Sequence, residues 1–201
     1  MNIFLLLENP TLCAEMHCDK HVVKMVIEYA QLMSTAHRVL DGDVYESKTA
    51  AGRRIKRWLH PNNNMENVLY KASHINHPDG LWVRSSDANY NYLYNLWCRL
   101  CEEYTHRYGR THLTEEKLKD LLRFPPSNIQ HASMADIHGL PLAMPEDVKG
   151  KSVVKSYRRY YKKYKMPFAR YTKREEPEFM IEELHAGYAC LLYTSPSPRD
   201  S

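Results

Sequence analysis

The chain has 201 residues, of which 43% are hydrophobic and 26% are charged, and its formal net charge is +4. These values are typical of one globular domain with a proper core, and they exclude wholesale disorder. No apolar run approaches a membrane span, and the start "MNIFLLLENP" lacks the features of a signal peptide. Cysteines without a secretory signal indicate reduced thiols, so we expect a cytoplasmic protein without a membrane partner.

The end of the chain needs its own interpretation. The segment from Cys190 to Asp200 reads "CLLYTSPSPRD", which is the translation of a transposase-type sequencing-library adapter. We therefore expect residues 190–201 to be adapter read-through and the native chain to be cut off near Ala189. Residues 1–189 are expected to form a single helical domain.

The first half of the chain begins with an apolar run from Met1 to Leu7, expected to be a short strand or an extended arm that ends at a turn signal. A helix is expected from Thr11, a candidate N-cap, to about Leu40. The segment from Val44 to Arg57 is polar and basic, and almost no alternating strand pattern occurs anywhere. A loop from 60 to 64 and a short helix from 65 to 73 complete this half.

In the second half, "INHPDGLW" (Ile75 to Trp82) is expected to be an irregular loop, because its Pro and Asp-Gly disfavour regular structure. Ser86 or Asp87 should cap the next helix, and Gly109 should end it. Further helices are expected over 114–122 and 152–165, separated by a long irregular segment. The predicted fold class is mainly α, a compact single-domain helical fold with a short extended N-terminal arm.

A polar stripe runs along the first predicted helix. At 100° per residue, His17, His21, Lys24 and Glu28 fall on one line, and apolar residues cover most of the remaining circumference. On a buried helix such a stripe must find partners or line a wet cleft, because each unpaired buried polar group costs ~1–3 kcal/mol. The stripe is either a seam of i,i+4 pairs or an acid/base set at a cleft. We favour the second, with these four residues as catalytic candidates.

The same histidines also have metal-ligand spacing. His17 and His21 are four residues apart, and His77 or His112 would add a third ligand to zinc or another divalent metal. The chain has no HExxH pattern, however, and Lys24 would repel a cation. We therefore expect no cofactor and keep the metal site His17, His21 and His77 as the alternative.

A basic, aromatic segment lies near the end of the chain. Between Lys149 and Arg174 there is no Asp or Glu, and tyrosines alternate with lysines and arginines. Such a segment offers a sequence-independent grip on phosphates, and its tyrosines would stack on bases or seat the helix on the core. The loop at 75–82 would supply a wedge or a stacking platform. The residues predicted to bind nucleic acid are Lys20, His77, Trp82, Arg158, Arg159, Lys162, Lys163 and Arg170.

Four motifs carry a resemblance to known proteins. "HCDKHVVKM", "NHPDGLW", "EYTHRYGRTH" and "SYRRYYKKYK…FARYTKREEPEF" resemble a family of uncharacterised phage and marine-metagenome proteins from Met1 to about Phe179. More remotely, the order of elements is similar to the pyrimidine-dimer DNA glycosylases of the phage endonuclease V family. Those are compact helical proteins with an N-terminal arm, in which the α-amino group forms an imine with C1′ of the damaged nucleotide and a Glu assists.

The resemblance implies roles for particular residues. The amine would be that of Met1, or of Asn2 if Met1 is removed, and Glu28 would be the acid. Lys20, Lys24 and His21 would hold phosphate or the opened sugar. The N-terminal Thr of that family is absent here, so an internal amine such as that of Lys24 is an alternative nucleophile.

The sequence therefore predicts a base-excision DNA glycosylase, with or without a lyase step, that works as a monomer on DNA in the cytoplasm of a phage-infected cell. One alternative is a metal-assisted hydrolase or nucleotide-modifying enzyme with His17 and His21 as ligands. The other is a non-catalytic phage DNA-binding protein that uses only its basic end.

Overall fold

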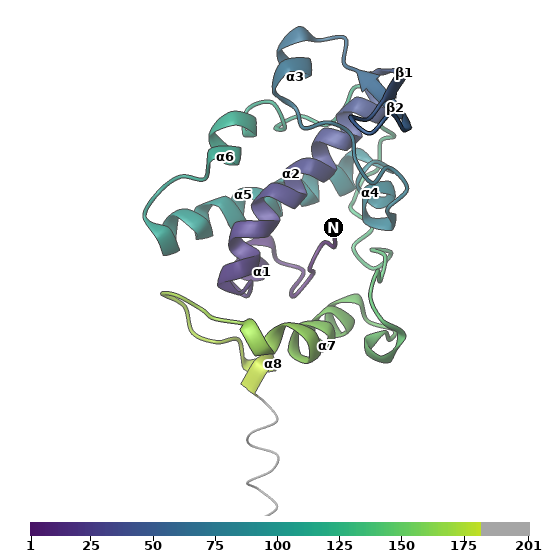
Figure 1. The fold of residues 1–201 in the computed structure, drawn as a ribbon. Helices are drawn as coiled ribbons and strands as arrows, with labels where there is room; N and C mark the ends of the chain where they lie inside the picture. Colours follow the sequence, from purple (N-terminus) through teal and green to yellow (C-terminus); the bar gives the residue numbers. More distant parts are fainter. Residues whose placement is uncertain (182–201) are drawn as a thin grey trace, which may run out of the picture.

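The computed structural model describes residues 1–181, and its architecture confirms the mainly α class (Figure 1). The helices in this range are α1 (Pro10–Glu15), α2 (Asp19–Asp41), α3 (Asn63–Val68), α4 (Pro78–Val83), α5 (Asp87–Tyr108), α6 (Leu113–Leu118), α7 (Val153–Lys165) and α8 (Glu178–Ile181). The strands are β1 (Asp43–Lys48) and β2 (Arg54–Leu59), and η1 (Glu146–Val148) and η2 (Met166–Phe168) are 3₁₀ turns.

The prediction for residues 190–201 lies outside the described residues. Among residues 1–181, every helix is too short or too polar to cross a membrane.

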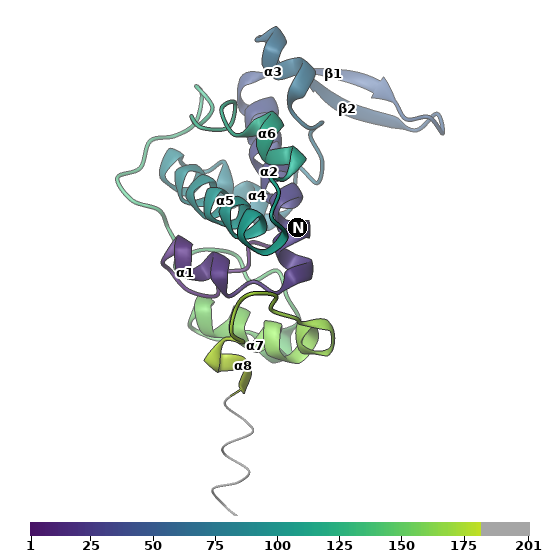
Figure 2. The same cartoon turned by 90° about the vertical axis from the view of Figure 1, so that its left-hand side faces the viewer.

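The core forms where α2 packs against α5, with α1 and α4 alongside (Figures 1 and 2). Met25, Tyr29 and Trp97 are fully buried there, and the Trp97 indole donates to the Val26 carbonyl oxygen at 2.8 Å. The expected N-terminal arm is present as extended chain between α2 and α7, and Ile3 and Leu5 on it are completely buried. The arm is thus part of the core, which fixes the position of the chain's first residue.

The single helix expected from Thr11 to Leu40 is wrong, because the chain forms two helices with a break at 16–18. Asn9 caps α1 by accepting the Thr11 and Leu12 amides, and Pro10 occupies the first turn. At the break, the Cys18 amide donates to the Tyr161 hydroxyl at 3.0 Å instead of to a helical carbonyl. A side chain from α7 therefore stabilises the start of α2, an interaction that local sequence cannot reveal.

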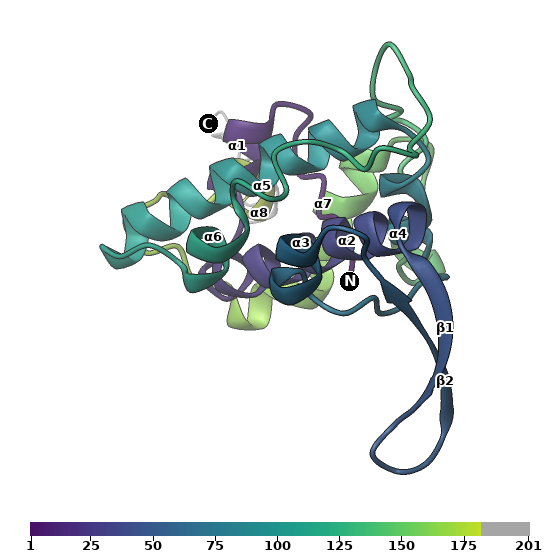
Figure 3. The ribbon, with the colours of Figure 1, turned by 90° about the horizontal axis from the view of Figure 1, so that it is seen from above.

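The antiparallel hairpin of β1 and β2 was not predicted. Its register runs from Asp43 opposite Leu59 to Lys48 opposite Arg54, and Gly52 in the turn has φ +77°. The hairpin projects away from the helical body (Figure 3). Because the helical body covers neither face of the hairpin, its strands need no alternation of hydrophobic and polar residues. The sequence of this segment therefore resembles that of a polar loop.

The stretch Ile75–Trp82 was expected to be irregular, but most of it belongs to α4. Pro78 occupies the first turn, where its missing N–H is not needed, and the His77 ring accepts the Asp79 amide at 3.2 Å as an N-cap. The caps predicted for the next helix are confirmed. Ser86 caps α5, and Gly109 ends it at φ +69°. The helices expected over 65–73 and 114–122 are shorter and begin earlier, as α3 and α6.

A buried ion network ties the start of α2 to α5 and to the chain after α7. The Arg107 guanidinium donates to Glu103 at 2.6 Å and to Asp19 at 2.8 Å. Arg174 pairs with the same Glu103 at 2.8 Å. Glu103 and Arg107 are each 3% exposed, so the centre of the network is buried, whereas Asp19 and Arg174 at its edges are partly exposed.

Candidate active site

The chain's first amino group lies against the middle of α2. The Met1 nitrogen is 4.0 Å from Glu28 Oε2, and Lys24 Nζ is 3.0 Å from Glu28 Oε1. The Glu28 side chain is 16% exposed and that of Lys24 is 63% exposed, so this part of the stripe reaches solvent. The structure therefore brings an amine and a carboxylate together at the partly buried start of the arm, next to the exposed Lys24.

Three hydrogen bonds hold the arm next to this amine. The Asn2 side-chain amide donates through Nδ2 to the Ala143 carbonyl oxygen at 2.6 Å. The Ile3 backbone N–H donates to Asp79 Oδ2 at 2.5 Å. The Phe4 N–H donates to the Tyr29 hydroxyl at 3.0 Å. These bonds come from α2, α4 and the segment before η1, so the position of the amine depends on the whole fold and not on the arm alone.

Asp79 is the most perturbed acid next to the arm. It is fully buried, and its second oxygen, Oδ1, has no hydrogen-bond partner. Burial raises the pKa of Asp79 to about 7, although the Ile3 N–H bond and the positive N-terminus work in the opposite direction. His77 Nδ1 lies 3.9 Å from Asp79 Oδ1. Burial and the N-terminal charge lower the pKa of His77, and Glu28 acts in the opposite direction. We call the Met1 amine, Lys24, Glu28, His77 and Asp79 the amine cluster.

The two histidines of the predicted stripe lie elsewhere. His17 precedes α2, and its ring nitrogens bond to the Cys13 carbonyl at 2.7 Å and to the Tyr29 hydroxyl at 3.3 Å. His21 packs on Phe4 with ring centroids 4.5 Å apart. Burial lowers the pKa of His17 to about 4 and, with neighbouring positive charges, that of His21 to about 2. Both are neutral parts of an aromatic core between the arm and α7.

The residues predicted to bind nucleic acid fall into two groups. Trp82 is 6% exposed and its indole donates to the Asp136 carbonyl, so it is a core residue and not a stacking platform. Arg158 and Arg159 are anchored through their Nε atoms to carbonyls of Leu6 and Val148. Lys163 pairs with Asp147, an acid just outside the segment that lacks acids. Lys20 and Arg170 are exposed, whereas Lys162 is partly buried.

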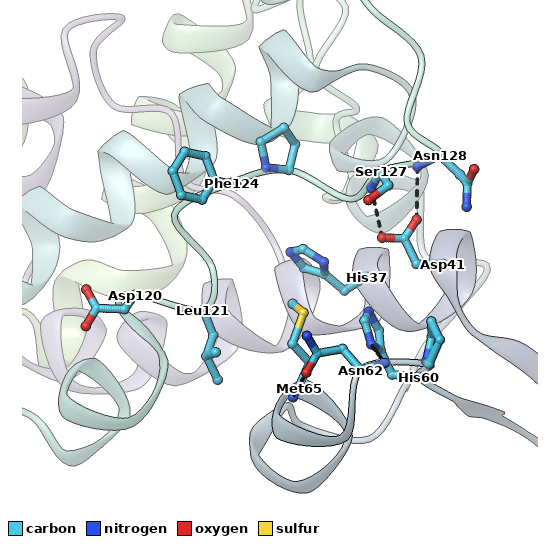
Figure 4. Close-up of a pocket in the computed structure, with 12 residues that line it drawn as sticks. His37, Asp41, His60, Asn62, Met65, Asp120, Leu121, Phe124, Ser127 and Asn128 are labelled. Atoms are coloured by element: carbon cyan, nitrogen blue, oxygen red, sulfur yellow. Dashed lines mark hydrogen bonds between the residues drawn. The ribbon is translucent and has the colours of Figure 1, made fainter.

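A further group of polar side chains lies at the other end of α2 (Figure 4). His37, Asp41 and His60 line a cavity of about 460 Å³ together with residues of the chain after α6. Their ligand atoms all lie within 4.8 Å of one another, and among residues 1–181 this is the one group of three able to hold a metal ion. The alternative set of His17, His21 and His77 does not form such a group. The sequence gives little indication of the group of His37, Asp41 and His60, because only the hairpin brings His60 next to α2.

No family model, curated protein or solved structure matches this chain. The resemblance to the phage proteins therefore remains a prediction from the motifs, and the more remote one to the pyrimidine-dimer glycosylases a prediction from the order of elements. The geometry of the amine cluster is independent of that resemblance.

Proposed function

We propose that this protein is a DNA glycosylase that uses its N-terminal amine as the nucleophile, with Glu28 as the assisting acid. The observation that carries the proposal is the 4.0 Å approach of the Met1 nitrogen to Glu28 at the partly buried start of the arm. An amine nucleophile held beside a carboxylate is the arrangement that imine chemistry requires.

The proposed reaction takes place at C1′ of the target nucleotide. The amine nitrogen attacks C1′, the C1′–N bond to the base breaks, and the base leaves with the bonding electron pair and a proton. Loss of an amine proton and opening of the sugar ring then give the imine, and water hydrolyses it if no strand cleavage follows. In this proposal Glu28, 4.0 Å from the amine nitrogen, takes a proton from the amine and gives one to the ring oxygen. Positioned groups of this kind typically contribute 10²–10⁴-fold.

The charges around the amine support a polyanionic substrate. Lys24 is exposed beside Glu28, and Lys20 extends over the Phe168 ring, with Nζ 4.7 Å from its centroid. Lys165 lies over Tyr160 at 4.8 Å and contributes to the low pKa of His21. These lysines come from α2 and α7 on either side of the arm, so phosphates on both sides of a nucleotide at the amine would find a cation.

The test compares Glu28→Gln with Glu116→Gln, whose side chain is exposed on α6. DNA duplexes carrying one abasic site or one cyclobutane pyrimidine dimer are incubated with each protein, and incision and borohydride-trapped adducts are measured. We expect trapping by the wild type and by Glu116→Gln, and an incision rate roughly 10²–10⁴-fold lower for Glu28→Gln. Absence of any adduct with the wild type on either DNA would overturn the imine mechanism.

A further inference from the structure

We propose that His37, Asp41 and His60 form a binding site for one divalent transition-metal ion, with zinc as the best match to two imidazoles and a carboxylate. The site is separate from the amine cluster, since it lies at the C-terminal end of α2, and it does not depend on the proposed glycosylase activity. The three side chains line the cavity, which leaves room for a bound ion and water beside them (Figure 4).

The first observation is that two buried ring nitrogens have no hydrogen-bond partner. His37 Nδ1 and His60 Nε2 are both orphaned, and the residues are only 3% and 5% exposed. A buried polar atom without a partner costs ~1–3 kcal/mol. One ring nitrogen of each histidine and one Asp41 oxygen lie within 4.8 Å of one another, so the two orphaned nitrogens indicate a shared polar occupant.

Neighbouring hydrogen bonds orient His37 and Asp41 as ligands. The Tyr90 hydroxyl donates to the Leu122 carbonyl at 3.0 Å, so at 2.9 Å it accepts a proton from His37 Nε2. That tautomer leaves a lone pair on Nδ1. The Asp41 oxygens accept the Ser127 and Asn128 amides at 2.8 and 2.9 Å, which fixes the carboxylate and leaves its other lone pairs free. Outer hydrogen bonds of this kind are typical of metal ligands.

Binding requires a local change at His60. Its Nδ1 accepts the Asn62 amide at 3.1 Å, which places the ring proton on Nε2 in the metal-free protein. Coordination through Nε2 moves the proton to Nδ1 and breaks the Asn62 contact, a loss of about 1 kcal/mol. Tetrahedral bonds of about 2.0–2.1 Å also bring ligand atoms to roughly 3.4 Å apart. His60 must therefore move inward, and its position in the loop between β2 and α3 allows this.

The ion would join three segments that are distant in sequence. His37 and Asp41 end α2, His60 follows the hairpin, and the Ser127 and Asn128 amides belong to the chain after α6. Bound metal would hold the base of the hairpin to the helical body. The expected physical consequence is a stabilised native state, because the unfolded chain does not present the three ligands together.

The experiment uses the untagged full chain, freed of metal with EDTA and dialysed. Titration with ZnCl₂ in a calorimeter should show one equivalent bound, and Co²⁺ should give the visible absorption of a tetrahedral site. His60→Gln should weaken Zn²⁺ binding at least 10²-fold. The matched control is His138→Gln, an exposed histidine outside the cluster, which should bind as the wild type does.

Two further readouts separate the metal site from other outcomes. Zn²⁺ should raise the thermal midpoint of the wild type but not that of His60→Gln, and the Asn62 amide resonance should shift on Zn²⁺ binding. Circular dichroism of the metal-free His60→Gln protein shows whether it folds. The proposal is overturned if the wild type binds no Zn²⁺, or if folded His60→Gln binds it equally well. Loss of Zn²⁺ binding without loss of incision would leave the glycosylase proposal intact.

Discussion

The middle and the C-terminal end of α2 present polar groups in opposite ways. Near its middle, Glu28 already pairs with Lys24 and with the Met1 amine, and the group reaches solvent. Near its C-terminus, His37 and His60 direct unpaired nitrogens into a cavity. A paired acid and amine suit proton transfer to a substrate that arrives from outside. Buried nitrogens without hydrogen-bond partners favour a ligand that stays bound. The helix α2 thus carries Glu28 of the amine cluster and, about three turns further along, His37 and Asp41 of the proposed metal site.

The largest expected effect concerns the ion network that holds the start of α2 against α5. Arg107→Met leaves Asp19 without its guanidinium and Glu103 dependent on Arg174 alone. Removing one member of a buried ion network typically costs 3–5 kcal/mol. Urea unfolding should show this loss, whereas Arg99→Met, which removes an exposed pair with Glu102, should cost less than about 1 kcal/mol. Equal losses in the two variants would show that the buried network does not hold α2 in place.

The second effect is acid sensitivity of the aromatic core beside the amine. His17 has a pKa of about 4 in the folded chain because it is buried, against an ordinary value of 6.5. The unfolded chain therefore binds a proton first as the pH falls, and the folded state loses about 3 kcal/mol between pH 6.5 and 4. The raised pKa of Asp79 has the opposite effect on stability. The folded state keeps the Asp79 proton more tightly than the unfolded chain does, so stability falls as the pH rises toward 7. Urea unfolding at pH 7 and pH 5 measures the balance, and His17→Gln should shift the stability difference between these pH values in favour of pH 5, relative to the wild type.

Those two effects also show what the sequence reveals. Lys24 and Glu28 were found because charges four residues apart on an apolar helix are visible in any helical projection. His17 was misplaced because the break before α2 depends on the Tyr161 hydroxyl, a contact 143 residues away. Asp79 escaped notice because its proline and glycine neighbours suggested a loop. His60 had no signal, since a hairpin exposed on both faces carries no hydrophobic pattern.

The third prediction concerns Asp79→Asn. The amide oxygen still accepts the Ile3 N–H, so the arm should stay in place, but the acid with a pKa near 7 is gone. If Asp79 accepts a proton from the amine, incision should fall by about tenfold near neutral pH, with a changed pH profile. A merely structural role would alter stability and leave the pH profile of incision unchanged. Rate profiles from pH 5.5 to 9 make the distinction.

The smallest effect is expected for Lys24→Met. The lysine is 63% exposed, so losing its pair with Glu28 should change stability by less than about 1 kcal/mol. Trapped adduct should still form, although DNA affinity should fall and depend less on salt. Loss of trapping in a folded Lys24→Met protein would make Lys24, and not the terminal amine, the nucleophile.

The most direct measurement is the location of the reduced adduct. Wild-type protein trapped with borohydride on abasic DNA is digested with nuclease and protease, and its peptides are sequenced by mass spectrometry. We predict that the sugar remnant is on the α-amine of the peptide that begins "MNIF", next to Glu28 in the fold. A remnant on Lys24 or on a lysine of α7 would contradict the assignment of the terminal amine as the nucleophile.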